Sequence, residues 1–262
     1  MKTFLLIFTA IFGLTLAYPS DDAKVVGGAD AARNQFPYQV SMQWGLLGIW
    51  QHICGGSIIS ARTVLTAAHC ITEVPNIGSF RVRAGILLLN DPIGTFPVNN
   101  VIATIIHPDY QGGVNPHDIA LLRLGSALIF GTNIAIIPLP TRDAIPTGNG
   151  VLSGWGSTSM TETPSMPNHM QFVSTPIITL DVCRSRLIEL FGNADPVHDT
   201  STLCTMAAGQ SGCSGDSGGP LTSNGEVVGV ASWAVLPCGA LTAPTGFARV
   251  SSYIDFINDN IL

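Results

Sequence analysis

A serine surrounded by glycines carries the sharpest chemical signal in the sequence. It lies in the run GDSGGP (215–220), where glycines let the backbone turn tightly and leave a hydroxyl and nearby amides open to a ligand. The run also satisfies G-x-S-x-G, the nucleophile elbow of α/β-hydrolases, whose triad follows the order serine, acid, histidine. No histidine follows Ser217, because the last one is His198. The α/β-hydrolase hypothesis therefore fails, and a general base must precede the serine.

A base and an acid can be proposed from two other segments. Among the six histidines, His69 ends an apolar segment, LTAAHC (65–70), beside a cysteine that could hold it in place. An imidazole with an ordinary pKa near 6.5 suits proton transfer around neutral pH. Asp118 opens the hydrophobic segment DIALL (118–122), where a carboxylate is costly to bury without a partner. We therefore predict Ser217 as nucleophile, His69 as base and Asp118 as orienting acid.

The first 24 residues predict export and processing. Lys2 supplies a positive charge before an apolar stretch (4–16), and small residues at positions 15 and 17 fit a cleavage site. This is the pattern of a secretory signal peptide, and the stretch is shorter than the roughly 20 apolar residues of a membrane anchor. We expect a signal peptide over 1–17, a pro-segment over 18–24, and a secreted mature chain that does not enter the membrane.

Composition argues against two function classes. The formal net charge of −6 disfavours nucleic acid as a partner, since that would need a basic patch. All six cysteines follow the signal peptide and suit an oxidising compartment, but spacing alone leaves their pairing open. No Cys-x-x-Cys pair or His-x₃₋₅-His pair is present, so we expect no zinc site.

The elements that must position these residues are mostly strands. Short segments rich in Val, Ile and Leu alternate with turns, and the chain has 28 glycines and 17 prolines. Strands are predicted at 57–66, 80–84, 98–106, 119–124 and 226–233. Helices are predicted at 181–190, with Asp181 as its N-cap, and at 251–262. The fold class is all-β and mostly antiparallel, as a sandwich or barrels with a C-terminal helix.

Six segments, taken in order, resemble the landmarks of the chymotrypsin–trypsin family of serine endopeptidases. They are VVGG (25–28), TAAHC (66–70), DIAL (118–121), GWG (154–156), GDSGGP (215–220) and SW (232–233). The resemblance implies one protease domain over 25–262, made of two antiparallel six-stranded β-barrels with the active site in the cleft between them. The N-terminal barrel would cover about 25–135, the C-terminal barrel about 136–250, and the terminal helix 251–262.

The resemblance also implies roles for individual residues. The amides of Gly215 and Ser217 would form the oxyanion hole of a Ser-His-Asp mechanism. A trypsin-like protease would cut after Lys24, and the freed α-amino group of Val25 would pair with Asp216. Three disulfides are implied by the family's spacing: Cys54–Cys70, Cys183–Cys204 and Cys213–Cys238.

Some residues depart from the family's patterns. The loop after Gly85, where calcium-binding relatives carry acidic residues, reads ILLLN (86–90). Structural calcium needs several oxygen ligands, so we predict no metal site there and no cofactor for the enzyme.

The specificity pocket departs from that of trypsins. Alignment to the family puts Ser211 at the pocket floor, where trypsin-like members carry Asp. Ala234 and Thr245 align to walls that usually have glycines, beside Ser232 and Trp233. We therefore expect a shortened apolar pocket with an elastase-like preference for Ala, Val or Leu. A chymotrypsin-like preference for Leu, Met and Phe is the alternative.

The expected binding partners follow from the family resemblance. We expect protein and peptide substrates, a trypsin-like activating protease, protein protease inhibitors, and a monomeric enzyme. The competing hypothesis from another class is a catalytically dead homologue that acts as a secreted binding module. Such proteins usually lose a triad residue, whereas all three are present here.

Overall fold

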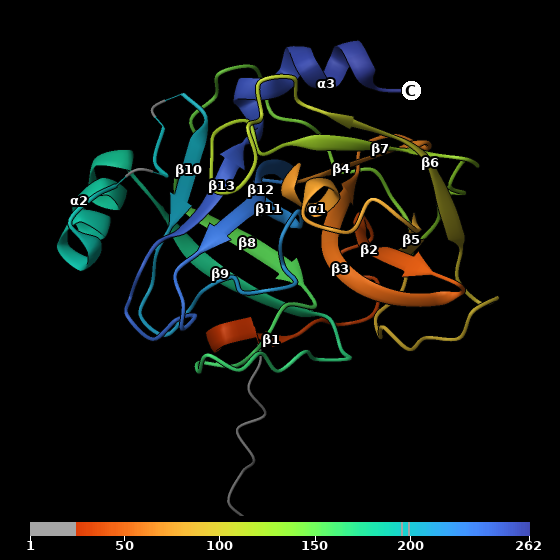
Figure 1. Ribbon diagram of the computed structural model, residues 1–262, viewed down its shortest axis with the longest axis horizontal. Helices are drawn as coiled ribbons and strands as arrows, with labels where there is room; N and C mark the ends of the chain where they lie inside the picture. The colour runs from red at the N-terminus through yellow and green to blue at the C-terminus, as the bar shows by residue number, and fades with distance from the viewer. Residues whose placement is uncertain (1–24, 195, 199) are drawn as a thin grey trace, which may run out of the picture.

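The computed structural model describes residues 25–194, 196–198 and 200–262 (Figure 1). The expected signal peptide and pro-segment, including Lys24, lie outside these residues. None of the helices in the described part of the chain is long and apolar enough to span a membrane.

Six strands from the first half of the chain close into a barrel. Neighbouring strands are antiparallel, and their order around the barrel is β2-β3-β4-β7-β6-β5. Apolar side chains of its strands, such as Val64, Leu65 and Leu121, are fully buried in one hydrophobic core, which stabilises the fold by about 1.5–3 kcal/mol for each such side chain. The strands are β2 (Gln39–Leu46), β3 (Ile49–Ile58), β4 (Thr63–Thr66), β5 (Ser79–Ala84), β6 (Val98–Ile106) and β7 (Ala120–Leu124).

The rest of the chain builds the second barrel, beside the first (Figure 1). Its sheet has the order β1-β9-β10-β13-β12-β11-β8, and β8 also pairs with β9, which closes the six longer strands. The prediction of two six-stranded antiparallel barrels is confirmed. The strands are β1 (Ala29–Asp30), β8 (Asn149–Gly154), β9 (Gln171–Ile178), β10 (Thr202–Thr205), β11 (Pro220–Ser223), β12 (Glu226–Ala234) and β13 (Thr245–Arg249).

The N-terminal segment belongs with the second barrel rather than the first. A 3₁₀ turn, η1 (Val25–Gly27), precedes β1, and β1 pairs with β9. The predicted boundary had placed this segment in the N-terminal barrel. Local sequence cannot indicate this partner, because β1 and β9 are more than 130 residues apart.

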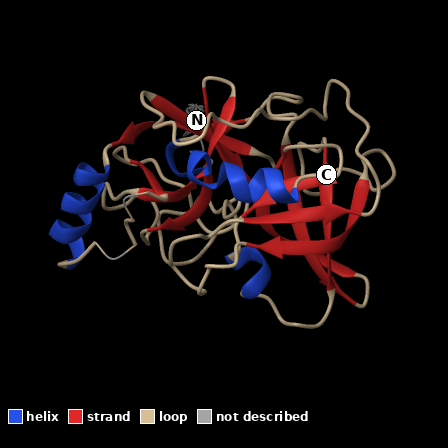
Figure 2. Cartoon of the chain, turned by 90° about the horizontal axis from the view of Figure 1, so that it is seen from above, coloured by secondary structure: helices blue, strands red, loops and turns tan. Residues whose placement is uncertain are grey.

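Helices lie around the barrels (Figure 2). They are α1 (His69–Thr72), α2 (Leu180–Phe191), the 3₁₀ helix η2 (Val250–Tyr253) and α3 (Ile254–Asn260). The N-cap of α2 is Thr179, whose hydroxyl accepts from Val182 N–H at 3.4 Å. The prediction of Asp181 as the cap is wrong; it lies in the first turn, where its charge suits the helix dipole.

The predicted strand 57–66 is in fact two strands joined by a tight turn. The amides of Ile59 and Ser60 both bond to the carbonyl of Thr63, at 3.1 and 3.3 Å, which closes the β3–β4 hairpin. The turn (59–62) reads Ile-Ser-Ala-Arg and contains no Gly, Pro, Asn or Asp, so composition did not mark the break.

One apolar core joins the two barrels. Val230 of β12, Val250 of η2 and Ile257 of α3 pack in the same core as the first-barrel side chains. The C-terminal helix therefore ties the second half of the chain to the first, and residues at the junction are held in fixed relation.

Candidate active site

His69 and Asp118 meet because two strands pair. In the β4–β7 pair, Thr66 lies opposite Ala120. His69 follows the end of β4 and Asp118 precedes the start of β7, so both reach the same edge of the barrel. His69 Nδ1 lies 2.7 Å from Asp118 Oδ2, and the His69 amide donates to Asp118 Oδ1 at 2.9 Å. From the second barrel, the Ser232 hydroxyl donates to Asp118 Oδ2 at 2.6 Å.

These contacts set the protonation chemistry of His69. Burial alone would lower its pKa, but the hydrogen bond and charge of Asp118, with a smaller contribution from Glu73, raise the pKa above its ordinary value. Because Asp118 holds Nδ1–H, the free Nε2 is left as the proton acceptor. The geometry is that of a general base with an orienting carboxylate.

Ser217 comes to this edge from the second barrel. Its carbonyl accepts from the Gly55 amide of β3 at 2.8 Å. Gly218, with φ at 72°, packs so closely on the first barrel that a Cβ there would clash with Thr66 Oγ1. Within the described chain no hydrogen bond joins Ser217 Oγ to His69, and such bonds are often long in the absence of substrate.

The backbone around the serine carries the two amides, of Gly215 and Ser217, that the family resemblance predicts to form the oxyanion hole. Gly215 has φ at 97°, and His52 Nε2 lies 3.1 Å from its carbonyl oxygen. Burial lowers the pKa of His52 to about 4, so the ring is neutral: Nε2–H donates to Gly215, and Nδ1 accepts from Ser41 Oγ at 2.8 Å. Among the described residues, the amides of Gly215 and Ser217 donate to no protein acceptor, so both remain open to a developing oxyanion.

His52 is a site residue that the sequence analysis missed. It lies in β3, two residues before Cys54, and its ring also packs edge-on against Trp155 at 5.7 Å. The only local signal was a histidine close to a cysteine in a strand, which is weak. Its role depends on contact with Gly215, which lies 163 residues away along the chain.

A pocket of about 130 Å³ opens beside Ser217. Of the predicted substrate-binding residues, Ser232, Trp233, Ala234 and Thr245 line it, together with Leu236, which the sequence analysis did not name. The predicted floor residue, Ser211, is buried and absent from the lining.

Ser211 makes its hydrogen bonds within the protein instead. It donates to the Gly212 carbonyl at 2.7 Å and lies 3.0 Å from Thr245 Oγ1. The hydroxyl expected at the pocket floor is thus engaged by the wall residue Thr245.

Asp216 lies in the turn between the oxyanion amides. Its carboxylate accepts from the Gly156 amide at 2.8 Å and from the Cys213 amide at 3.0 Å. Burial raises its pKa to about 6, and these two bonds only partly offset the effect. Close to this turn, Val26 is buried against the Cys213–Cys238 disulfide and its carbonyl accepts from the Ser211 amide at 3.3 Å.

The structure has the three disulfides that the resemblance implied. They join Cys54 to Cys70, Cys183 to Cys204, and Cys213 to Cys238, with sulfur–sulfur distances of 1.99, 2.14 and 2.06 Å. The first links β3 to the residue after His69, and the last lies beside the pocket.

Two groups of side chains in the described part of the chain are close enough to be considered as metal ligands. In the first, Cys54 and Cys70 already form the disulfide beside His69. In the second, His107 and His117 stack with ring centroids 4.7 Å apart and planes only 12° from parallel. Imidazole binds a metal in its ring plane, so these two rings do not converge on one ion. The absence of a metal cofactor stays a prediction.

Comparison with known proteins places this arrangement in a family. The family model described as Trypsin matches residues 25–257. The chain belongs to the trypsin family. It is 34% identical to Serine protease 1 of Canis lupus familiaris over 265 residues, covering 100% of this chain and 99% of that protein. It is also 34% identical to Trypsin-1 of Astacus astacus over 244 residues, covering 90% and 99% of the two chains.

The chain is therefore a serine endopeptidase of this family, a hydrolase that acts on protein or peptide substrates. A further relative, Trypsin alpha of Drosophila erecta, is 36% identical over 215 residues, covering 82% of this chain and 79% of that protein.

Proposed function

We propose that this trypsin-family enzyme is a secreted protease that uses Ser217 as nucleophile, His69 as base and Asp118 as orienting acid. The observation that carries the proposal is Asp118, which bonds to the His69 amide, to His69 Nδ1 and to the Ser232 hydroxyl, so that Nε2, whose one contact in the described chain is with the disulfide sulfur of Cys70 at 3.8 Å, is the ring nitrogen left to act as the base. Ser217 would attack the scissile carbonyl while His69 takes its proton. His69 would then protonate the leaving amine, and water would hydrolyse the acyl-enzyme.

The oxyanion of each tetrahedral intermediate would be held by the amides of Gly215 and Ser217. Both amides are unused by the protein in its described part, and the carbonyl of Gly215 is anchored by His52. Loss of one donor from such a site costs about 2.7–4 kcal/mol of transition-state stabilisation.

For specificity we propose an elastase-like preference for small to medium apolar residues before the scissile bond. Ala234 and Thr245 narrow the pocket, and Ser211 is engaged with Thr245 instead of facing the substrate. Several relatives are named trypsin, but no carboxylate stands at position 211, so a substrate Arg or Lys would enter without a partner. A chymotrypsin-like preference for Leu, Met and Phe is the second candidate, favoured by the apolar Leu236 at the pocket.

We also propose that the enzyme is made as a zymogen and activated by a trypsin-like protease that cuts after Lys24. Support comes from Asp216, which is buried with two amide donors and has no ion-pair partner among the residues that the structure describes. The burial of Val26 beside Cys213 brings the segment after the cut close to this carboxylate. The free ammonium of Val25 would complete the pair.

Three further features remain proposals. They are secretion through the signal peptide at 1–17, a monomeric state, and binding by protein protease inhibitors. Disulfides among all six cysteines support an oxidising location.

Replacing Ser217 with Ala tests the assignment. We expect peptide hydrolysis to fall by about 10⁶-fold, following analogous triads, and fluorophosphonate labelling to be lost while the fold is kept. Ser214→Ala is the matched control, since this neighbouring serine in the same turn is exposed; it should label like the wild type. Hydrolysis by Ser217→Ala within tenfold of wild type would exclude Ser217 as nucleophile. A wild type that folds but neither labels nor hydrolyses would favour the binding-module alternative.

A further inference from the structure

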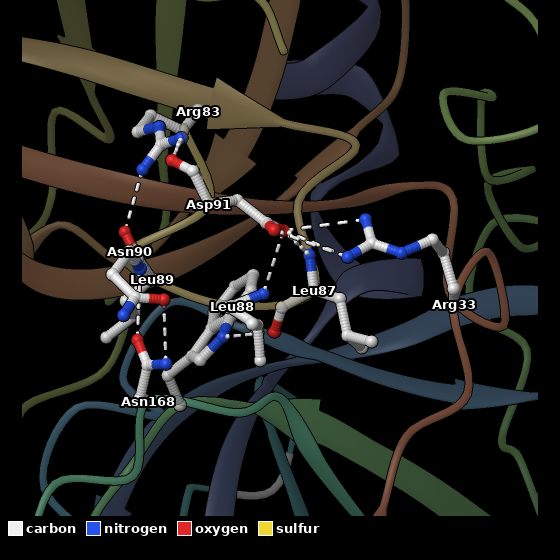
Figure 3. Close-up of polar contacts among 9 residues, drawn as sticks. Arg33, Arg83, Leu87, Leu88, Leu89, Asn90, Asp91 and Asn168 are labelled. Carbon is white, nitrogen blue, oxygen red and sulfur yellow. Dashed lines mark hydrogen bonds and ion pairs between the residues drawn. The ribbon is translucent and has the colours of Figure 1, made fainter. Parts of the chain in front are cut away.

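The loop Gly85–Asp91, which we call the Asp91 loop, is organised around its one acidic side chain (Figure 3). The Asp91 carboxylate turns back and accepts from the Leu87 and Leu88 amides at 2.8 and 3.0 Å. It is 7% exposed. Burial alone would raise its pKa, but the two amides and Arg33 outweigh this, so the pKa lies below its ordinary value. The carboxylate is therefore charged at neutral pH.

Two arginines from different parts of the chain supply the positive charge around this loop (Figure 3). Arg83 of β5, only 3% exposed, donates to the carbonyls of Leu89 and Asp91 at 2.7 and 2.6 Å. Arg33, from the N-terminal segment, donates to the Asp91 carboxylate at 3.3 Å. A guanidinium is planar, permanently charged and able to donate from two nitrogens at once. Arg83 therefore binds two loop oxygens and supplies a fixed positive charge to the loop.

The Asp91 loop in turn holds Trp155. The carbonyl of Leu87 accepts from the Trp155 indole N–H at 3.1 Å and from the Met170 amide at 2.9 Å. Asn90 and Asn168 add two more hydrogen bonds, of 3.0 and 2.8 Å, between the loop and the second barrel. Leu87 is thus fixed on one side by Asp91 and on the other by Trp155.

Trp155 lies next to two residues, Gly156 and His52, that bond to the oxyanion turn. Its chain neighbour Gly156 donates to Asp216 at 2.8 Å. The edge-on contact of Trp155 with His52 places the imidazole that bonds to the Gly215 carbonyl. A shift of Trp155 would therefore move two supports of the Gly215 amide together.

We propose that Arg33, Asp91 and Arg83 are positioning residues for the peptidase reaction. They fix Leu87, Leu87 fixes Trp155, and Trp155 sets Gly156 and His52 so that the Gly215 amide faces the oxyanion. Arg33 also ties the segment that follows Val25 to the first barrel. This inference rests on the proposed function of Gly215 as an oxyanion donor.

The experiment uses the full activated chain and the variants Arg33→Gln, Asp91→Asn, Arg83→Met and Arg83→Lys. The control is Arg142→Gln, which removes an exposed ion pair with Asp255. Both residues are distant in sequence from the Asp91 loop. The folded fraction is measured by circular dichroism, and reactive serines are counted by fluorophosphonate titration. The values of kcat and KM are then measured on a peptide amide and expressed per folded molecule.

We expect kcat per folded molecule to fall roughly tenfold in Asp91→Asn and Arg83→Met with KM nearly unchanged, because an oxyanion donor acts mainly in the transition state. Arg83→Lys should recover part of the loss, since it keeps the charge but not the fork. Arg33→Gln should show a smaller loss because its side chain is 45% exposed. Arg142→Gln should match the wild type.

Unchanged kcat per folded molecule in both Arg33→Gln and Asp91→Asn would overturn the proposal. This holds even if both variants melt at a lower temperature, because lost stability without lost kcat indicates that these residues act only on the stability of the fold. These two variants decide the question if Arg83→Met does not fold. A wild type that hydrolyses nothing and does not label would instead contradict the proposed function, so the two failures are distinguishable.

Discussion

Two buried carboxylates near the junction of the barrels have opposite surroundings. Asp118 is 2% exposed and accepts hydrogen bonds from the His69 amide, the His69 ring and the Ser232 hydroxyl. Asp216 is 1% exposed and accepts from only two backbone amides. Burial raises the pKa of Asp216 to about 6, because its two backbone hydrogen bonds only partly offset the desolvation and no cation in the described part of the chain pairs with it.

The surroundings of Asp118 suit the proposed catalysis, whereas those of Asp216 suit the proposed control by activation. The partners of Asp118 come from both barrels and are in place as soon as the barrels pack together. Asp216 lies in one turn of the second barrel and has no cationic partner among the described residues, so in the proposed activation a new positive charge there would stabilise the turn without disturbing the base. An unpaired buried charge costs about 3–5 kcal/mol when its partner is removed, which is enough to switch the order of a turn.

In this comparison the largest expected effect comes from removing the charge of Asp118, which orients His69. Asp118→Asn should lower kcat by about 10⁴-fold, because the amide favours the wrong imidazole tautomer. The fold and the labelling site should persist, as shown by circular dichroism and by slow labelling of Ser217. A loss of less than tenfold would mean that Asp118 does not orient the base.

The corresponding change at Asp216, whose carboxylate has only two amide partners in the described chain, should lower activity less than Asp118→Asn does. It should act by preventing activation rather than by disturbing the base. Asp216→Asn should be cut after Lys24 at the normal rate, yet activity should stay about 10²–10³-fold below the activated wild type because the Gly215 amide is not ordered. N-terminal sequencing and kcat check both points. Lys24→Gln, which should resist trypsin, provides the uncut control, and a fully active uncut chain would contradict the activation proposal.

A graded effect is expected in the specificity pocket. Ala234→Gly combined with Thr245→Gly should shift preference toward Phe and Tyr by about 10–200-fold, because each removed group is worth a methylene or two. Thr245→Gly also removes the partner of the Ser211 hydroxyl. Peptide-library profiling of wild type and variant measures the shift. Wild-type preference for Tyr over Ala or Leu, or ready cleavage after Arg, would show that the pocket is assigned wrongly.

The smallest expected effect concerns pH. His69 must be neutral to accept a proton, and its pKa is raised, so kcat/KM should fall with acid around a midpoint above 6.5. Glu73→Gln removes one charge that raises the pKa of His69 and should move the midpoint to lower pH, less at high salt because Glu73 is exposed. A flat profile from pH 5 to 8 would count against His69 as the base.

Much of the fold was readable from local sequence. The predicted strand 98–106 coincides with β6, where enrichment in Val and Ile favours a strand, and the predicted helix 181–190 lies inside α2. The hairpin between β3 and β4 was missed because its turn (59–62) contains no Gly, Pro, Asn or Asp to mark it. The N-cap Thr179 was missed because Asp181, two residues further on, is an equally good capping type.

The sequence by itself determined the order of the motifs, the chemical types of the proposed triad and the absence of a carboxylate at position 211. Those properties depend on residue identity and short spacing. Only the tertiary structure decided that Ser211 is engaged by Thr245, that His52 holds Gly215, and that Asp91 and Arg83 reach Trp155. Each of these contacts joins strands or loops that are far apart along the chain, and which side chain fills such a junction depends on barrel closure and packing rather than on any local pattern.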